Sequence, residues 1–407
     1  MDRRAFLAAG SVTAAAPLLG WPGLSAAASE PTDGLASQLP VNFWSDGLGL
    51  DPAQYARHLQ AAVDAGGWSP DGYSNGGLVA GIERAFAQRL GKPAAVYLPS
   101  GTLANHLAVR TLAGADRRVL VQADSHLYND SGDGAATLSG LNLVPLVEGR
   151  ATLTVEDVAP WVERSAHGRV PNPVGVISLE SPVRRLDHAM ADLAQTERLS
   201  TYARERGIRL HLDGARLFNL PLHTGRRVAG IAALFDTVYV SLWKHFNGTA
   251  GAVLAGDEAT ISGLSHMRRM FGASLPQAWP TLALVPQHLA RYEDDYAKAW
   301  AAADLLIARL EASGRFKARK LERGTSRFFL SAPGTDLDAL AERAAQRGVL
   351  LPGGPPGATE FAMQVNPSLL RWPPDRVADV LLASLSAQSP RPRGPTPARA
   401  PAAAAAR

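Results

Sequence analysis

The stretch Ile208–Arg216 reads IRLHLDGAR, and the interpretation of the whole chain starts from it. Residues 208–212 have the pattern of a β-strand, which ends in the carboxylate of Asp213. In open α/β sheets, ligands bind beyond the carboxyl ends of the strands, so Asp213 is a candidate ligand-binding residue. Two other interpretations stay open: Asp213 caps a following helix, or it ligates a metal with His211, for which no third ligand is well placed.

Strand-like and helical segments alternate around this stretch. Apolar β-branched runs between amphipathic helices predict an α/β domain with a mostly parallel sheet and helices on both faces. The expected strands are 94–98, 119–122, 143–145, 174–179, 208–212, 236–242 and 251–254. The expected helices are 78–90, 101–112, 155–164 and 191–206.

Beyond about Gln277, the pattern becomes that of a small C-terminal α+β domain. The expected elements there are a helical region at 281–312, strands at 327–330 and 361–365, and helices at 337–347 and 374–385. The predicted organisation is a signal peptide at 1–28, an N-terminal arm and large domain at 29–280, a connecting helix and small domain at 281–388, and a disordered Pro/Ala/Arg tail at 389–407.

Composition limits the functions that the chain can have. Hydrophobic residues make up 46% of its 407 residues and charged residues 19%, which suffices for a large buried core. The sequence has no cysteine, which excludes disulfides, thiolate catalysis and Cys-ligated zinc. The net charge is only +4, and no basic cluster is interleaved with aromatic residues, so we expect no nucleic-acid binding.

The N-terminus has the pattern of an export signal. Arg3 and Arg4 precede an apolar, alanine-rich run through about Leu24, and small residues follow through Ala28. Paired arginines followed by Phe-Leu resemble a twin-arginine signal, a route that carries folded proteins. We expect recognition by the twin-arginine export machinery, cleavage near Ala28 and a periplasmic location. An ordinary secretory signal and an uncleaved anchor are the alternatives.

Two further segments place polar residues just after expected strands. Ser100, Gly101 and Thr102 open a helix, and a helix N-terminus with a glycine suits a phosphate group. Ser and Thr are also ordinary helix caps, so this signal is weak alone. His126 follows the strand at 119–122, where it can stack on a planar cofactor, relay protons or have a purely structural role.

Lys244 lies at the end of another apolar strand, in the segment SLWKHFNG at 241–248. Lysine is rarely drawn into a protein interior without a function. Burial and nearby cations would lower the pKa of its amine and favour Schiff-base chemistry. A carboxylate at Asp213 could in turn keep a pyridine nitrogen protonated, which makes the ring an electron sink.

The order of these segments resembles that of one enzyme family. A phosphate loop, a stacking histidine, an Asp-x-x-Arg strand end and then a lysine occur in this order in pyridoxal-phosphate (PLP) enzymes of the aspartate-aminotransferase fold. The stretches PSGTLANHLA (99–108), HLDGARLFN (211–219) and SLWKHFNGTAGAVLAG (241–256) are similar to the threonine aldolase / β-eliminating lyase family. The likeness extends from about Asn42 to Val377. It implies a lyase that breaks a bond at the α- or β-carbon of a β-hydroxy or β-substituted amino acid.

The resemblance implies which residues would hold the cofactor. Lys244 would bind PLP as a Schiff base, Asp213 would pair with the ring nitrogen, and His126 would stack on the ring and take part in proton transfer. The phosphate would be held by Ser100, Gly101 and Thr102.

The resemblance also implies substrate contacts and an oligomer. Ser45 and Arg216 would bind the carboxylate of the amino-acid substrate, with Arg216 also near the phenolic oxygen of the cofactor. Tyr73 would reach in from a neighbouring subunit, which implies a homodimer or homotetramer. No metal site is expected.

Two arginines of the family pattern are absent from this sequence. The strand around Met363 lacks the arginine that binds the substrate carboxylate, and Pro276 stands in place of one that supports the phosphate. Arg184 and Arg185 could supply the missing charge, or they could be a surface pair. We therefore expect threonine to be a poor substrate. Another PLP reaction, such as transamination or racemisation, and a non-catalytic exported protein with the same fold remain alternatives.

Overall fold

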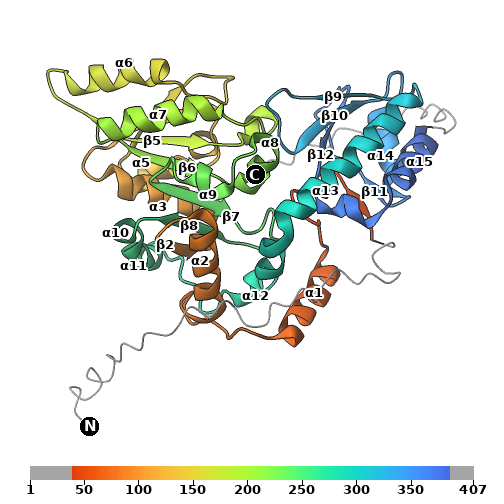
Figure 1. Ribbon diagram of the computed structural model, residues 1–407, viewed down its shortest axis with the longest axis horizontal. Coiled ribbons are helices and arrows are strands. Elements are labelled where there is room, and N and C mark those ends of the chain that lie inside the picture. The colour runs from red at the N-terminus through yellow and green to blue at the C-terminus, as the bar shows by residue number, and fades with distance from the viewer. Residues whose placement is uncertain (1–38, 386–407) are drawn as a thin grey trace, which may run out of the picture.

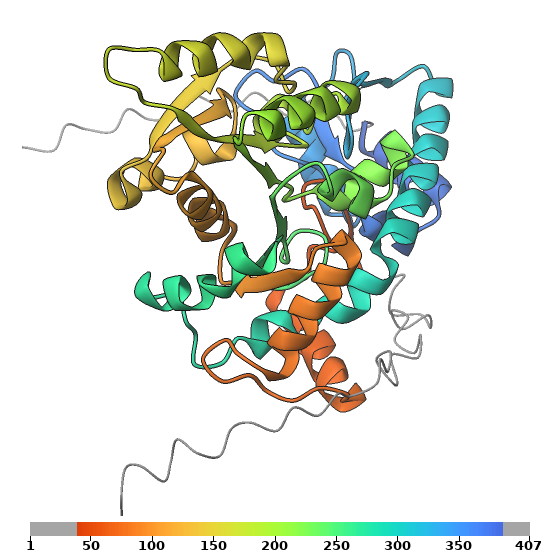
Figure 2. The same ribbon diagram turned by 60° about the vertical axis from the view of Figure 1, so that its left-hand side comes forward.

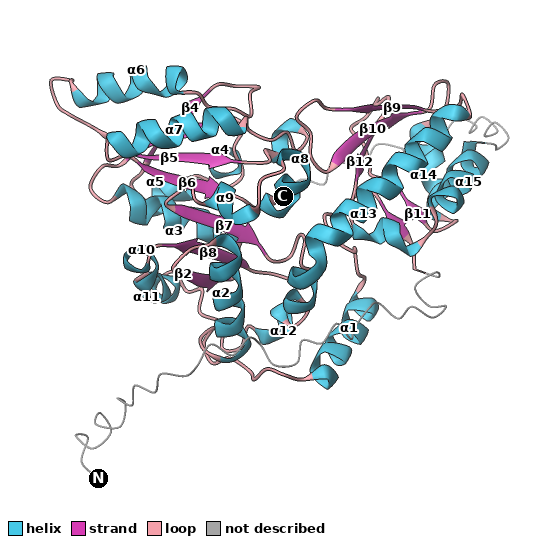
Figure 3. Ribbon diagram, in the orientation of Figure 1, coloured by secondary structure: helices cyan, strands magenta, loops and turns pink. Residues whose placement is uncertain are grey.

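The computed structural model describes residues 39–385, which form a large and a small domain joined by a long helix (Figures 1 and 3). The large domain is built on a seven-stranded sheet. In spatial order its strands are β2 (Ala94–Leu98), β8 (Ala252–Gly256), β7 (Thr237–Ser241), β6 (Arg209–Asp213), β5 (Val174–Glu180), β3 (Arg118–Gln122) and β4 (Asn142–Leu146). Strand β8 is antiparallel to both neighbours and the other pairs are parallel, so the predicted sheet is confirmed.

Helices cover both faces of this sheet, as the sequence predicted (Figure 2). Alternating strand residues supply the two cores: in β2, Leu98 packs on one face and Tyr97 on the other. One face carries α3 (Gly101–Ala113), α5 (Gly134–Ser139), α10 (Glu258–Ser262) and α11 (Leu264–Met270). The other carries α2 (Gly77–Leu90), α6 (Val155–Ala166), α7 (Leu193–Glu205) and α9 (Val228–Ala232). Two short helices follow strand ends: α4 (His126–Asn129) and α8 (Leu220–Thr224).

The small domain has an antiparallel sheet in the order β12-β10-β9. Its elements are α13 (Val285–Ala312), β9 (Lys317–Lys320), β10 (Arg327–Ser331), α14 (Leu337–Ala345), β11 (Val349–Leu350), β12 (Phe361–Gln364) and α15 (Pro374–Leu385). The helical region expected at 281–312 is two helices, α12 (Trp279–Leu282) and α13, with Pro286 in the first turn of α13, where a missing N–H is tolerated. Within residues 39–385, none of the helices has the length and hydropathy to cross a membrane.

The N-terminal arm crosses between the two domains. The sequence grouped it with the large domain, but its strand β1 (Val41–Asn42) pairs in parallel with β11 of the small domain. Helix α1 (Pro52–Ala65) follows, and it was not predicted, although Asp51 and Gln54 form a capping box at its start. The predicted signal peptide and the predicted tail from 389 lie outside the described residues.

Candidate active site

A cavity of about 320 Å³ lies at the carboxyl ends of β5, β6 and β7, beside the start of α3. Most of the predicted site residues line it: Ser100, Gly101, Thr102, His126, Arg184, Asp213, Arg216 and Lys244. Three others do not: Ser45, Tyr73 and Arg185. The fold therefore brings the four sequence segments together at one edge of the sheet, where open α/β sheets bind ligands.

Asp213 ends β6 and is almost fully buried. Its carboxylate accepts hydrogen bonds from Asn105 Nδ2 at 2.5 Å and from the backbone N–H of Ala215 at 3.1 Å. The metal alternative finds no support, because both ring nitrogens of His211 bond to protein side chains and no group of three or more suitable ligands occurs within residues 39–385. Asp213 thus presents a fixed carboxylate to the cavity.

Lys244 follows β7 and points its amine at the ring of Trp243, 4.3 Å from the centroid. Burial, and then the charge of Arg216, lower the pKa of Lys244 to about 8, against the influence of nearby carboxylates. With such a pKa, roughly a tenth of the amine is neutral at neutral pH. The neutral amine is the form that attacks a carbonyl group, so Lys244 is suited to Schiff-base formation.

The first turn of α3 forms a cradle for an anion. The Ser100 hydroxyl caps the helix by accepting from Leu103 N at 3.2 Å, so the cap interpretation holds as well. A Cβ atom on Gly101 would lie 1.9 Å from the Tyr239 hydroxyl, so only glycine lets the loop pass over that side chain. The free backbone N–H groups in the first turn of α3 favour the binding of a phosphate in the part of the cavity beside this helix.

His126 begins α4 at the wall of the cavity. Its backbone N–H donates to Glu180 Oε2 at 2.6 Å, which holds the residue against β5. Its ring Nδ1 is buried and has no hydrogen-bond partner within the described part of the chain. A buried polar atom without a partner is unusual, and a bound ligand would satisfy it.

Glu180 is a cavity residue that the sequence interpretation missed. It ends β5 at the position paired with Asp213 on β6, so two carboxylates stand side by side. Burial, and then the charge of Asp213, raise the pKa of Glu180 to about 7, against hydrogen bonds from the backbone N–H groups of Arg184 and His126. A carboxylate at the end of the otherwise apolar strand VGVISLE was the available signal.

The other titratable groups around Glu180 come from neighbouring elements. They are Asp213, Arg216, Tyr239, Lys244 and Arg185. The group as a whole is mixed in charge, so the proton on Glu180 depends on which of its neighbours are ionised.

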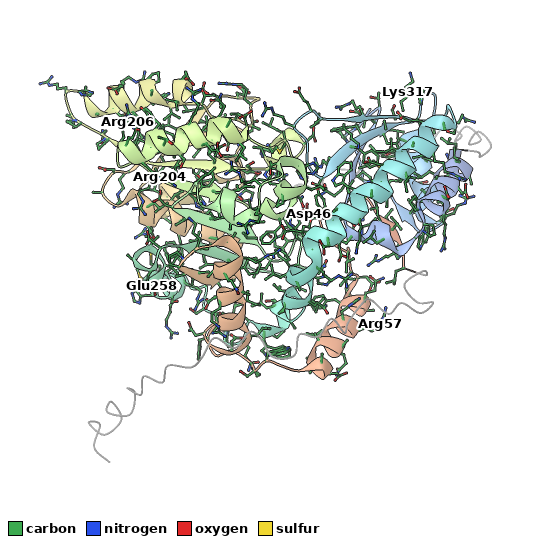
Figure 4. The ribbon with its side chains drawn as sticks, in the orientation of Figure 1. Asp46, Arg57, Arg204, Arg206, Glu258 and Lys317 are labelled. Carbon is green, nitrogen blue, oxygen red and sulfur yellow. The ribbon has the colours of Figure 1, made fainter. Side chains whose placement is uncertain are left out.

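Arg216 forms a buried, bidentate ion pair with Asp46 of the arm, which lies between the domains (Figure 4). The distances are 2.7 Å from Nε and 2.8 Å from Nη2. Burial alone would raise the pKa of Asp46, but the charge and hydrogen bonds of Arg216 hold it well below its usual range. The sequence interpretation chose Ser45 from this segment, but the Ser45 hydroxyl donates to the carbonyl of Gly47 at 2.7 Å. Ser45 borders a neighbouring recess of about 270 Å³, which also includes Lys244.

Arg184 and Arg185 share one carboxylate. Arg184 donates to Asp130 at 2.6 Å, and Arg185 donates to both of its oxygens at 3.2 and 2.8 Å. The hydrogen bond from Arg185 is the main cause that lowers the pKa of Asp130 to about 2. Both arginines are partly exposed, and only Arg184 reaches the cavity. Arg184 therefore remains the better placed of the two for a substrate carboxylate.

The small domain approaches the Asp46–Arg216 pair through Gln364. Its Nε2 lies 3.3 Å from Asp46 Oδ1. Arg327 pairs with Gln364 across β10 and β12 and binds Asp187 at 2.9 Å. The sequence interpretation did not single out Arg327, which is a cation close to this pair although it does not line the cavity.

Tyr73 does not line the cavity of its own chain, and 57% of its surface is exposed. Its backbone is in the left-handed region at φ 51°, and its N–H donates to the carbonyl of Pro276 at 2.9 Å. Below it, Asp71 is buried and accepts from Ser74 N and from Ala278 N. A firmly held loop therefore displays an aromatic ring to the outside.

The fold and this site define an α/β protein of the PLP-dependent transferase type. A serine palmitoyltransferase solved with PLP has the same fold, with a TM-score of 0.60 over 85% of this chain and 88% of that chain at 16% identity. A profile of the β-eliminating lyase family matches residues 45–324, and the chain belongs to this family. The predicted fold and family are confirmed.

Individual relatives of this chain are named as threonine aldolases. A low-specificity L-threonine aldolase from Candida albicans is 32% identical over 200 residues, which are 48% of this chain and 53% of that protein. The chain thus spans about half the length of curated relatives that it matches. A solved protein from Listeria monocytogenes, assigned as an L-allo-threonine aldolase, has a TM-score of 0.70 and 26% identity and covers 86% of this chain and 97% of that chain.

Proposed function

We propose that this protein is a PLP-dependent lyase that breaks a bond at the α- or β-carbon of a β-hydroxy or β-substituted amino acid. The observation that carries the proposal is the convergence of Lys244 and Asp213 on one cavity that starts at the N-terminus of α3. Membership of the β-eliminating lyase family and the names of its threonine aldolase relatives support the reaction class. They support PLP as the cofactor as well, together with the solved PLP enzyme of the same fold.

The residues present fit this cofactor. The Gly101 cradle suits its phosphate, the Asp213 carboxylate its ring nitrogen, the planar His126 ring at the cavity wall its face, and the Lys244 amine its aldehyde. When bound, PLP supplies an electron sink that stabilises a developing carbanion. The protein supplies the orientation and the proton transfers.

The chain provides two groups that can move protons near the reacting atoms. Glu180 has a pKa of about 7, so it can either hold or release a proton at neutral pH. Lys244 has a pKa of about 8 and can accept a proton once its amine is free. Arg216, kept in place by Asp46, orients a substrate carboxylate, and that orientation determines which bond is weakened.

Threonine is proposed to be a poor substrate. The strand around Met363 carries no arginine, and Gln364 next to it occupies a place beside Asp46. A charge-assisted, bidentate contact of the kind that arginine makes contributes on the order of 1.5–3 kcal/mol. Its absence would weaken the binding of a small substrate about ten- to a hundredfold.

Product analysis with a panel of amino acids tests the lyase proposal directly. We expect the purified holoprotein to absorb as a Schiff base and to release a carbonyl compound from β-hydroxy amino acids. Borohydride reduction and peptide mapping should place the pyridoxyl group on Lys244, and Lys244→Ala should abolish turnover. A pyridoxyl group on another residue, or amino-group transfer without bond cleavage, would contradict the proposal.

We also propose a homodimer or homotetramer with a shared site, because Tyr73 is displayed on a rigid outward-facing loop. Mixing Lys244→Ala with Tyr73→Phe subunits should restore part of the activity through hybrid oligomers. A monomer in light scattering would rule this out.

Export by the twin-arginine route to the periplasm is supported by Arg3 and Arg4 before the apolar run. Replacing both with lysine should retain the precursor in the cytoplasm. Unchanged export of that variant would exclude this route.

A further inference from the structure

Behind Asp213, three buried side chains form a continuous chain of hydrogen bonds. Asn105 on α3, His211 on β6 and Thr237 on β7 have no exposed surface. Thr237 Oγ1 lies 2.9 Å from His211 Nδ1, His211 Nε2 lies 2.9 Å from Asn105 Oδ1, and Asn105 Nδ2 lies 2.5 Å from Asp213 Oδ2. By sequence, only His211 was considered, as a possible metal ligand with Asp213, and none of the three lines the cavity.

The donor and the acceptor of each hydrogen bond in this series can be assigned. Because Asn105 donates its amide hydrogen to Asp213, its carbonyl oxygen must accept from His211. Burial lowers the pKa of His211 to about 4, so its ring is neutral and carries one hydrogen, on Nε2. His211 Nδ1 then accepts from the Thr237 hydroxyl. All of the donated hydrogens therefore point toward Asp213.

This series of hydrogen bonds determines which of the two carboxyl groups that line the cavity, Asp213 or Glu180, carries a proton. Burial disfavours two charges at the paired positions Asp213 and Glu180, so one of them takes a proton. Asp213 accepts two hydrogen bonds, one of them at the end of the chain, and Glu180 accepts two from backbone N–H groups. Without Asn105, Asp213 would keep only one donor, and the proton would move to it.

We propose that Thr237, His211 and Asn105 are a proton-ordering relay that keeps Asp213 ionised and aimed at the ring nitrogen of the cofactor. They are positioning residues, since they act through Asp213 and touch neither cofactor nor substrate. The inference rests on the proposed PLP function. Its consequence is that the ring nitrogen keeps its proton, because an ionised Asp213 beside it stabilises the charge of the protonated ring.

The relay predicts an effect that depends on one atom of the cofactor. Apoproteins are titrated with PLP and with 1-deaza-PLP, in which a C–H group replaces the ring nitrogen, and binding is followed by tryptophan fluorescence. For Asn105→Ala and His211→Leu, we expect affinity for PLP to fall about ten- to a hundredfold. Affinity for 1-deaza-PLP should stay near that of the wild type, which also shows that both variants fold.

His211→Gln is the matched control. A glutamine carboxamide can donate to Asn105 and accept from Thr237, as the neutral imidazole does, so this variant should recover most of the PLP affinity. An equal loss for both cofactors would show that the residues are merely structural, and unchanged affinities would show that the relay is unnecessary. Either result overturns the relay while leaving the lyase proposal intact. Failure of the wild type to bind PLP would overturn the proposed function and the relay with it.

A second measurement needs no cofactor. At a pH below the Glu180 pKa of about 7, infrared spectra of the apoprotein should show a protonated carboxyl band that Glu180→Gln removes. With Glu180 kept and the aspartates labelled with carbon-13, we expect the band of the wild type to keep its position and the band of Asn105→Ala to shift, because the proton then resides on Asp213. A band that is unshifted by the label in both proteins would contradict the relay.

Discussion

Two walls meet at Arg216, and they are built in different ways. The cofactor wall is the lining of the cavity, which comes from the large domain, and the polar atoms behind Asp213 are linked to one another in buried hydrogen bonds. The substrate wall lies beside the cavity, where the arm and the small domain meet at Asp46 and Gln364, which do not line it. Under the proposed function, the first wall would hold the cofactor, and the second would position the substrate through Arg216. The contacts of the substrate wall could then change without altering the residues of the cofactor wall.

Two residues of the large domain next to the substrate wall have a strained backbone. Asp187 and His188 are consecutive non-glycine residues in the left-handed region, at φ 52° and 61°. Asp187 holds Arg327, and His188 bonds to Ser326 at 2.8 Å, so this turn attaches the small domain to the large one. Such conformations persist only where surrounding contacts enforce them, and they concentrate at functional sites.

The largest expected effect tests whether the substrate wall depends on its ion pair. Asp46→Asn leaves Arg216 buried without a counter-charge, which should lower the free energy of unfolding by about 3–5 kcal/mol. Urea denaturation measures it. The control is Asp375→Asn, which breaks an exposed ion pair with Arg309 and should change stability little. Equal effects of the two substitutions would show that the buried pair has no special role.

The next effect concerns the cofactor wall and depends on pH. The pKa of Glu180 is raised from 4.5 to about 7, so its contribution to stability is complete below about pH 4.5 and is lost as the pH rises toward 7. Glu180→Gln should remove this loss, which is on the order of 3 kcal/mol. Urea midpoints of the apoprotein across this range test the prediction, with the exposed Glu205→Gln as control. A Glu180→Gln profile as steep as that of the wild type would contradict it.

The smallest effect concerns the two arginines that follow β5, of which one lines the cavity. Arg184 lines the cavity and Arg185 does not, although both bind Asp130. Arg184→Ala should raise KM about tenfold with the cofactor still bound, and Arg185→Ala should have little effect. Steady-state kinetics on the best amino acid of the panel separates the two. Efficient cleavage of threonine that neither substitution affects would show that the prediction about the substrate is wrong.

Local pattern was enough for most of the fold. Strand β2 and helix α15 have the predicted bounds, and the other predicted elements of the large domain differ by one or two residues, whereas its short helices α4, α5 and α8–α11 were not predicted. Strand β9 has the sequence KARK, with exposed side chains and no apolar alternation, so it carried no signal. Helix α1 did carry one, since Asp51 and Gln54 have the spacing of a capping box.

The candidate site likewise has residues that the sequence could predict and residues that it could not. Asp213 and Lys244 could be predicted because each one is a polar residue at the end of an apolar strand, and strand order places such ends together. Asp46 and Arg216 could not be paired from sequence, because 170 positions separate them and only the crossing of the arm brings them into contact. Glu180 owes its raised pKa to burial beside Asp213, which no local sequence pattern shows.

The sequence by itself determined the family, the sheet and the choice of residues proposed to hold the cofactor, because these depend on hydrophobic periodicity and on short motifs whose residues are adjacent in the chain. Only the tertiary structure decided the ionisation of Glu180, the pairing of Arg216 with Asp46, the sharing of Asp130 by two arginines and the relay behind Asp213. The physical reason is that charge and hydrogen bonding act through distance and burial, and these are properties of the folded chain.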